Sequence, residues 1–317
     1  MGRKKISHWK FFFLVFALSI LAYLINENRT VNVKVLGITS EGDFVIPMRW
    51  KDKKRLDYFF RGVCLIQQWA YTLIGSKPVT FTGLQKPFTT KRSLWPSNFR
   101  NYLGWKTWLK YQSYFSQSPF LIFPDREPGQ EKTIYMTIVD KAHFDRVVRE
   151  NMQDFQIVLG RKIIDSQVLL NEALLSPFLC EVLKNHDGLI GTVLGYGREN
   201  AWAFYNRDEA KEGFLGSAWE PELLDEMIVR LSKKDWSFEA WDLSDLYFPS
   251  FAADPESDET KKLKQLYRED REKIVRYYKG KDFVEATLRL LNGNRDQIEC
   301  DKKFSLDARE TLARIVH

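Results

Sequence analysis

The spacing of apolar residues along the chain of 317 residues changes from strand-like to helical and back. Residues 31–38 alternate as a strand does, and a second extended segment covers 44–50 after a turn. Apolar side chains then recur at helical spacing over 53–74, where Gly75 and a following proline end the helix. The clearest strand in the sequence is 131–139, because it is rich in β-branched and aromatic residues.

The second half of the chain has a mostly helical pattern. Asp140 caps a helix that runs to Leu159 and ends at Gly160. Further helices are predicted at 166–175, 177–184, 220–234, 254–279, 282–291 and 306–316. The sequence therefore predicts an α+β fold that is predominantly helical with a small sheet.

The N-terminal part of the chain has a basic stretch, then an apolar stretch, then a polar one. This order is typical of a signal peptide or a signal anchor. Residues 1–10 form a basic tail, 11–25 are apolar, and 26–29 are polar. Fifteen apolar residues span only about 22 Å as a helix, against a hydrocarbon core of roughly 30 Å, so length leaves the question open. Cleavage requires small residues at two flanking positions, and Ala22 has Ile20 where one is needed.

We therefore expect one N-terminal transmembrane helix, a signal anchor at 11–25, before the folded region. The basic tail would stay in the cytoplasm and the bulk of this single-pass protein would be exported, into the periplasm in a bacterium. Cleaved secretion is the alternative. The exported part divides into a strand and helix region at 31–139 and a mainly helical region at 140–317, which we expect to pack together as one domain.

The charge of the chain is concentrated in two segments. The net charge is +6, and Ser76 to Pro124 contains seven Lys and Arg residues but no Asp or Glu. Prolines interrupt 76–130, so we predict a loop-rich segment in which only 101–115 forms a helix. Aromatic residues lie between the cations, as suits an anionic membrane surface, an envelope polymer or nucleic acid, and an exported location disfavours nucleic acid.

This basic aromatic segment supplies the binding residues that we predict: Lys91, Arg92, Arg100, Trp105, Lys106, Trp108 and Lys110. The alternative is that the aromatic rings fill the core while the lysines are solvated. The lipid bilayer at 11–25 is a further expected partner.

Four glycines, Gly188, Gly191, Gly195 and Gly197, occur in a stretch that otherwise has a helical pattern. Within a helix they would cost about 2 to 4 kcal/mol relative to alanine. A dinucleotide-binding turn needs a following strand that ends in an acidic residue, and 208–222 has no such pattern, so no cofactor is expected. We expect close helix packing at these glycines. A break before a helix near Arg198, whose N-terminus would attract an anion, is the alternative.

Catalytic and metal-binding patterns are scarce. The three cysteines, Cys64, Cys180 and Cys300, are too far apart for a disulfide framework or a metal site, and no metal is expected. Cys180 and His186 would need a turn between them to form a nucleophilic pair. Carboxylates near His186, such as Glu199, permit a glycan hydrolase, although no spacing singles out a pair.

The helix at 254–279 is charged on one side and apolar on the other. Either it is a solvated helix of the domain or it binds a protein partner.

Three stretches resemble uncharacterised, membrane-anchored proteins of chlamydia-like intracellular bacteria. They are GSKPVT at 75–80, LGYGREN at 194–200 and FAADPESDET at 251–260. The resemblance implies a bacterial envelope setting and no catalytic activity. Together with the charge pattern, it favours a membrane-anchored envelope protein with a non-enzymatic binding or scaffolding role, and an envelope hydrolase is the alternative.

Overall fold

The computed structural model describes residues 29–35, 44–87, 96–125, 132–207, 216–219 and 241–294, together with Asp225 and Val229. The predicted transmembrane segment 11–25 and the predicted helix 306–316 lie outside these residues, as does nearly all of 220–234. Within the described residues, none of the helices is both long and apolar enough to cross a membrane.

A three-stranded antiparallel sheet lies at the centre of the molecule. Its strands are β3 (Val79–Gln85), β5 (Thr133–Asp140) and β4 (Phe120–Asp125), in the order β3-β5-β4. The central strand is β5, which the sequence predicts most clearly. Its Val139 lies opposite Val79 on one side and Leu121 on the other.

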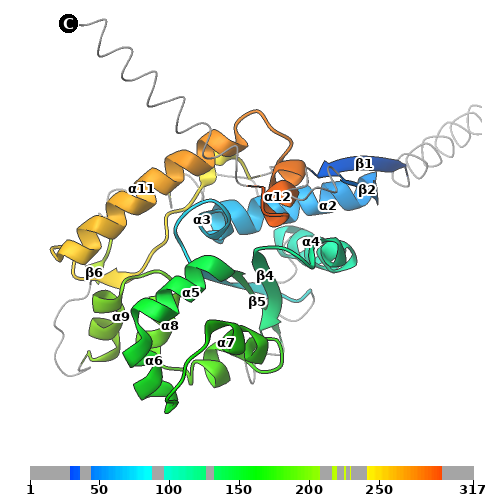
Figure 1. The fold of residues 1–317 in the computed structure, drawn as a ribbon. Coiled ribbons are helices and arrows are strands. Elements are labelled where there is room, and N and C mark those ends of the chain that lie inside the picture. Colours follow the sequence, from blue (N-terminus) through cyan, green and yellow to red (C-terminus); the bar gives the residue numbers. More distant parts are fainter. Residues whose placement is uncertain are drawn as a thin grey trace, which may run out of the picture.

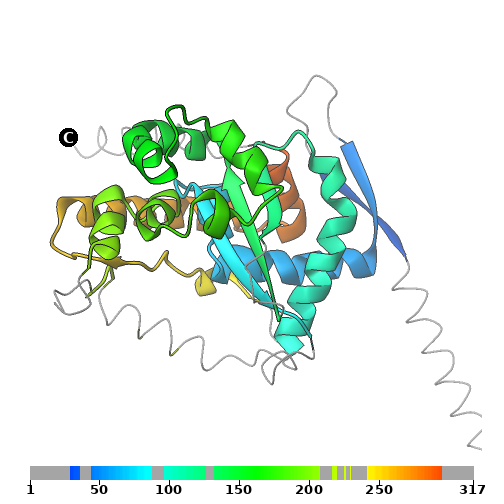
Figure 2. The same cartoon turned by 90° about the horizontal axis from the view of Figure 1, so that it is seen from below.

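Helices cover both faces of this sheet (Figures 1 and 2). The first face packs against α2 (Trp50–Arg61), α3 (Trp69–Leu73), α4 (Pro96–Tyr111), α11 (Asp258–Tyr278) and α12 (Phe283–Leu291). The second packs against α5 (Lys141–Glu150), α6 (Met152–Leu159), α7 (Ser166–Ala173) and α8 (Asp187–Val193), and α9 (Arg198–Tyr205) packs on α8. Met136 and Ile138 belong to the first apolar cluster and Val139 to the second, so β5 is buried on both faces. The fold is α+β and predominantly helical, as predicted.

Two smaller antiparallel pairs complete the strands of the described residues. β1 (Thr30–Val35) and β2 (Phe44–Arg49), the two extended segments predicted at the start of the folded region, form an antiparallel pair. Its inner side is buried, whereas Lys34 and Arg49 are exposed on its outer side. β6 (Gly216–Ser217) pairs with β7 (Ala252–Ala253).

The helix predicted over 53–74 is broken in the structure. After α2, residues Gly62–Ile66 form a π-helical turn, and Gln68 adopts φ 67° before α3 begins. The π-helical turn leaves the Leu65 carbonyl to accept a hydrogen bond of 2.7 Å from the Tyr247 N–H. A contact between residues far apart in the sequence therefore accompanies this break. The predicted helix 140–159 is likewise divided, at Asn151, although Asp140 caps it and Gly160 ends it as expected.

The loop-rich prediction was wrong for the described part of 76–130, although the helix predicted at 101–115 is present. The segment contains β3, the sixteen-residue helix α4, a 3-10 turn at Gln112–Phe115 and β4. Gly104 allows α4 to approach α2 closely, because a Cβ added there would lie 2.2 Å from the Phe59 Cβ. The prolines of the segment lie at or outside the ends of these elements, or at the exposed Pro124 on β4, an edge strand of the sheet.

The charged helix predicted at 254–279 begins later, at α11, where the Ser257 hydroxyl accepts a hydrogen bond of 3.1 Å from the Thr260 N–H. Its apolar side includes Tyr267, Ile274 and Tyr278, all buried in the first cluster. The domain's own core therefore covers the side that a helical partner would use.

Candidate binding sites

The tryptophans of the basic aromatic segment belong to the core. Trp105 and Trp108 are each 2% exposed and pack on Phe59 and Phe60, with ring centroids 6.2 and 5.8 Å apart. They do not form the exposed aromatic surface that we predicted from composition. The alternative, in which the rings fill the core, describes these two residues.

The cations of the same segment are placed differently. Lys106 and Lys110 are exposed on α4, and the Lys110 Nζ lies 3.6 Å from an Asp52 oxygen. The Arg100 guanidinium lies over the ring of Tyr58, 5.3 Å from its centroid. Lys91 and Arg92 are outside the described residues.

Further cations surround Lys106 and Lys110 in the folded structure. α4 lies beside the start of α2 and the β1–β2 pair (Figure 2), and β1 begins directly after Arg29. The described stretches 29–35, 44–56 and 96–111 contain ten basic residues and one acidic residue, Asp52, which is buried. The exposed cations form a surface that we term the basic end: Arg29, Lys34, Arg49, Lys54, Lys106 and Lys110.

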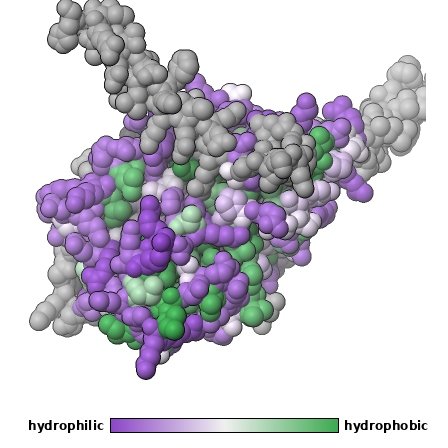
Figure 3. All heavy atoms as spheres, in the orientation of Figure 1, coloured by the Kyte–Doolittle hydropathy of each residue, from purple (hydrophilic) through white to green (hydrophobic). Residues whose placement is uncertain are grey.

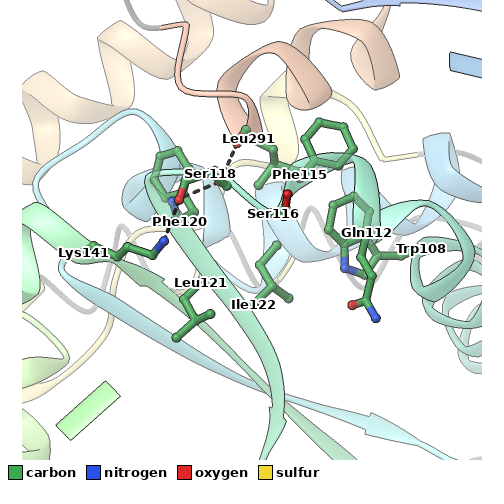
Figure 4. A pocket seen from close by; sticks show the side chains of 10 residues that line it. All are labelled: Trp108, Gln112, Phe115, Ser116, Ser118, Phe120, Leu121, Ile122, Lys141 and Leu291. Carbon is green, nitrogen blue, oxygen red and sulfur yellow. Dashed lines mark hydrogen bonds between the residues drawn. The ribbon is translucent and has the colours of Figure 1, made fainter. Parts of the chain in front are cut away.

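A pocket of about 170 Å³ opens beside the C-terminal part of α4 (Figure 4). Its walls come from α4, the 3-10 turn, β4 and the end of α12, and are mostly apolar: Trp108, Phe115, Phe120, Leu121, Ile122 and Leu291. Lys141 lies at one edge, where its Nζ donates a hydrogen bond of 2.7 Å to the Ser118 carbonyl. Three aromatic residues of the predicted binding segment thus meet at a cavity rather than on a flat surface.

An exposed apolar patch lies elsewhere, over α6 and α7 (Figure 3). Ile157, Ile163 and Leu175 are 77%, 85% and 89% exposed there. The patch is on a different side of the molecule from the basic end.

The four glycines divide between a helix and the turn after it. Gly188 and Gly191 lie on α8, and a Cβ added at Gly191 would be 2.7 Å from the Ala201 Cβ of α9. Gly195 and Gly197 have φ of 79° and 87°, so the helix ends before them and α9 begins at Arg198. The stretch is therefore a close helix pair joined by a tight turn.

The N-terminus of α9 already binds a carboxylate from the same chain. The N–H groups of Glu199 and Asn200 donate to the Glu259 side chain over 3.2 and 2.9 Å. Arg198 turns away, toward Asp154, with an Nε to Oδ2 distance of 2.6 Å. Since helix N-termini favour negative charge, Glu259 fills the place where the sequence suggested an external anion.

Replacing Glu259 with glutamine is expected to lower the free energy of unfolding by about 1 to 2 kcal/mol, because the amide is uncharged and can accept through only one oxygen. Chemical denaturation measures this difference. Glu272→Gln, at an exposed position of the same helix, is the control and should change stability by less than about 0.5 kcal/mol. Equal losses in the two variants would contradict the assignment.

Lys77 is a buried cation that the sequence did not single out as special. It is 1% exposed, its Nζ donates a hydrogen bond of 2.6 Å to the Leu194 carbonyl, and it lies 4.5 Å from the centroid of the Tyr196 ring. Burial lowers its pKa to about 7. Within the described residues no carboxylate pairs with it, so no opposite charge offsets the cost of burying its ammonium group.

The catalytic candidates His186 and Glu199 are not joined in the described structure. The His186 Nδ1 accepts a hydrogen bond of 3.3 Å from the Leu189 N–H, and the imidazole stacks on Tyr205 with centroids 3.9 Å apart. The Glu199 side chain is exposed on α9, and no hydrogen bond joins it to His186 in the described structure. The thiol of Cys64 is buried, which raises its pKa to about 12. Nowhere in the described ranges do three or more metal-ligating side chains gather.

Comparison with known proteins finds no matching family, no matching curated protein and no matching solved structure. The function must therefore be inferred from the basic end and the pocket.

Proposed function

We propose that this protein is a non-enzymatic binding protein, anchored in a membrane by residues 11–25, whose basic end contacts anionic lipid headgroups. One observation carries the proposal. Ten basic residues and one acidic residue occupy 29–35, 44–56 and 96–111, next to the apolar segment, and Lys53 is the one among them that pairs with Asp282 and Glu285 of α12. Because cations near an anionic bilayer are attracted to it, this arrangement favours a fixed orientation of the domain on the membrane.

The length of chain between the anchor and the domain supports this geometry. Arg29 follows Ile25 by four residues, which reach at most about 14 Å when fully extended. With residues 11–25 in the bilayer, Arg29 is therefore held close to the headgroups. Surface charges are screened over about 8 Å at physiological salt, so the nearest cations of the basic end still experience the lipid charge.

This orientation has a consequence for the rest of the protein. The layer of α5 to α9 lies away from the β1–β2 pair in both ribbon views (Figures 1 and 2). It would project from the membrane and present its surface to other components. With the basic residues 1–10 on the cytoplasmic side, that surface would be exported.

Neutralising two cations of the basic end is expected to weaken membrane binding about tenfold or more, since each is worth about 1 kcal/mol at an anionic surface. The variant is Lys106→Gln with Lys110→Gln, in a chain that begins at Arg29. This chain retains every described residue and both apolar clusters. Co-sedimentation with phosphatidylglycerol vesicles measures the binding, which should also fall as salt is added.

Lys261→Gln with Lys262→Gln is the matched control. These two lysines are exposed near the start of α11. This end of the helix, unlike its C-terminal end, lies far from β1 and β2 (Figure 1). Vesicle binding that is insensitive to salt, or equally reduced in both double variants, would contradict the proposal. Binding to a soluble anionic glycan without binding to vesicles would assign the basic end to an envelope polymer instead.

A further inference from the structure

The pocket beside α4 contains a buried polar group that has no partner among the described residues. The Trp108 Nε1 forms no hydrogen bond in this part of the chain, although the residue is 2% exposed. Figure 4 shows this nitrogen on the edge of the indole that faces Ile122 across the pocket. Buried N–H groups without an acceptor are rare and destabilising, so this one indicates a missing acceptor in the cavity.

The other polar atoms around the pocket define the chemistry of that acceptor. The Ser118 carbonyl accepts from Lys141, and the Leu291 carbonyl accepts from the Ser118 hydroxyl. These two acceptors are therefore already bonded. The Lys141 ammonium has two N–H groups beyond the one used, and the Gln112 amide and the Ser116 hydroxyl, each of which can donate or accept, lie at exposed positions of the lining. A lining with donors and a cation suits an anionic ligand that has acceptor oxygens.

The volume and walls define the remainder of the ligand. An apolar cavity of about 150 Å³ accommodates a benzene-sized molecule, so a pocket of 170 Å³ accommodates about six to eight non-hydrogen atoms. Phe115, Ile122 and Leu291 provide apolar contacts for them. Drug-sized ligands need roughly 300 Å³ or more and would not fit.

We propose that this pocket binds a small carboxylate with a short hydrocarbon chain or a single ring. One carboxylate oxygen accepts the Trp108 Nε1–H, the Gln112 amide donates at the rim, and the hydrocarbon lies against Phe115, Ile122 and Leu291. The Lys141 ammonium supplies positive potential at the far edge. This proposal is independent of membrane binding by the basic end.

Titration calorimetry with sodium hexanoate tests the proposal on the full chain in lipid nanodiscs, with the heat from empty nanodiscs subtracted. We expect a Kd of about 1 mM, in keeping with eight non-hydrogen atoms. Trp108→Phe keeps an aromatic ring but removes the donor and should weaken binding about tenfold. Trp105→Phe is the matched control, because Trp105 is on the same helix, is equally buried and does not line the pocket. It should leave the Kd unchanged.

A second pair of variants does not disturb the core. Gln112→Glu places a like charge beside the ligand carboxylate and should weaken hexanoate binding several-fold while leaving binding of 1-hexanol unchanged. Ser113→Glu adds the same charge at the next exposed position, which does not line the pocket, and should have little effect. Absence of hexanoate binding, binding of 1-hexanol as tight as that of hexanoate, or equal effects of Gln112→Glu and Ser113→Glu would each overturn the proposal.

Discussion

Replacing Gly195 with alanine is expected to lower the free energy of unfolding by about 3 kcal/mol or more. Two costs add. The backbone at Gly195 has φ 79°, a region that costs an L-residue about 1 to 2 kcal/mol. An added Cβ would also lie 2.7 Å from the Tyr267 hydroxyl and 2.9 Å from the Pro78 Cδ. Tyr267 is buried and donates a hydrogen bond of 2.6 Å to the Gly195 carbonyl, so it cannot move away without losing that bond.

Gly160→Ala separates the two costs. Gly160 has a similar φ of 67°, and a Cβ added there would meet nothing within 4 Å. This variant should therefore show only the conformational cost, about 1 to 2 kcal/mol. Denaturant unfolding of the chain that begins at Arg29 measures both values. Equal losses in the free energy of unfolding would show that packing of the turn against Tyr267 and Pro78 adds no cost at Gly195.

The free energy of unfolding is expected to rise by about 2 kcal/mol between pH 7 and 9 because of Lys77 alone, with a slope that approaches about 1.4 kcal/mol per pH unit above pH 8. The pKa of Lys77 is about 7 in the folded protein, since burial penalises its charged form. In the unfolded chain a lysine has a pKa of about 10.4. Within this interval the unfolded chain therefore holds a proton that the folded protein has released, and raising the pH favours the folded state.

Lys77→Met should remove this increase, because methionine has a similar length and no charge. Burial of the charged lysine lowers the free energy of unfolding in full below pH 7, and this loss disappears as the pH rises toward 10. The free energy of unfolding should therefore change with pH at different slopes in the two proteins. Lys106→Met, at an exposed position, should retain the slope of the unchanged protein. The buried Tyr196, whose pKa is raised to about 12, becomes destabilising only above this interval, where tyrosines of the unfolded chain ionise. Parallel pH profiles for the protein and Lys77→Met would show that Lys77 is charged or solvated when folded.

Elements whose signals are local could be predicted from the sequence. The strand β5 follows from its β-branched residues, and the β1–β2 pair from alternation on both sides of a turn. Asp140 and Gly160 begin and end their helical region as expected, because capping depends on the residue and its nearest neighbours. For α11, a solvated helix of the domain was one of the two interpretations of its charge pattern.

The route of the chain between these elements depends on distant contacts. The helix predicted over 53–74 breaks where the Leu65 carbonyl bonds to Tyr247, 182 residues away. Gly104 permits the close approach of α4 to α2, yet a single glycine within a proline-rich segment gave no sign of it. In the glycine stretch, Gly191 makes a comparable contact with the next helix, α9, whereas Gly195 and Gly197 both lie against side chains of α11 and need their positive φ.

In the candidate sites, too, some features follow from local sequence and others from contacts between distant residues. Composition located a cationic and aromatic segment, but composition is the same whether a ring is buried or exposed. Only packing places Trp108 in the wall of a pocket and Lys106 on the surface. Likewise, the sequence indicated that a helix N-terminus near Arg198 would attract an anion, because that property is local to the first helical turn. The tertiary structure supplied Glu259 as that anion, since its carboxylate reaches the Glu199 N–H, 60 residues away in the sequence, only when the chain folds.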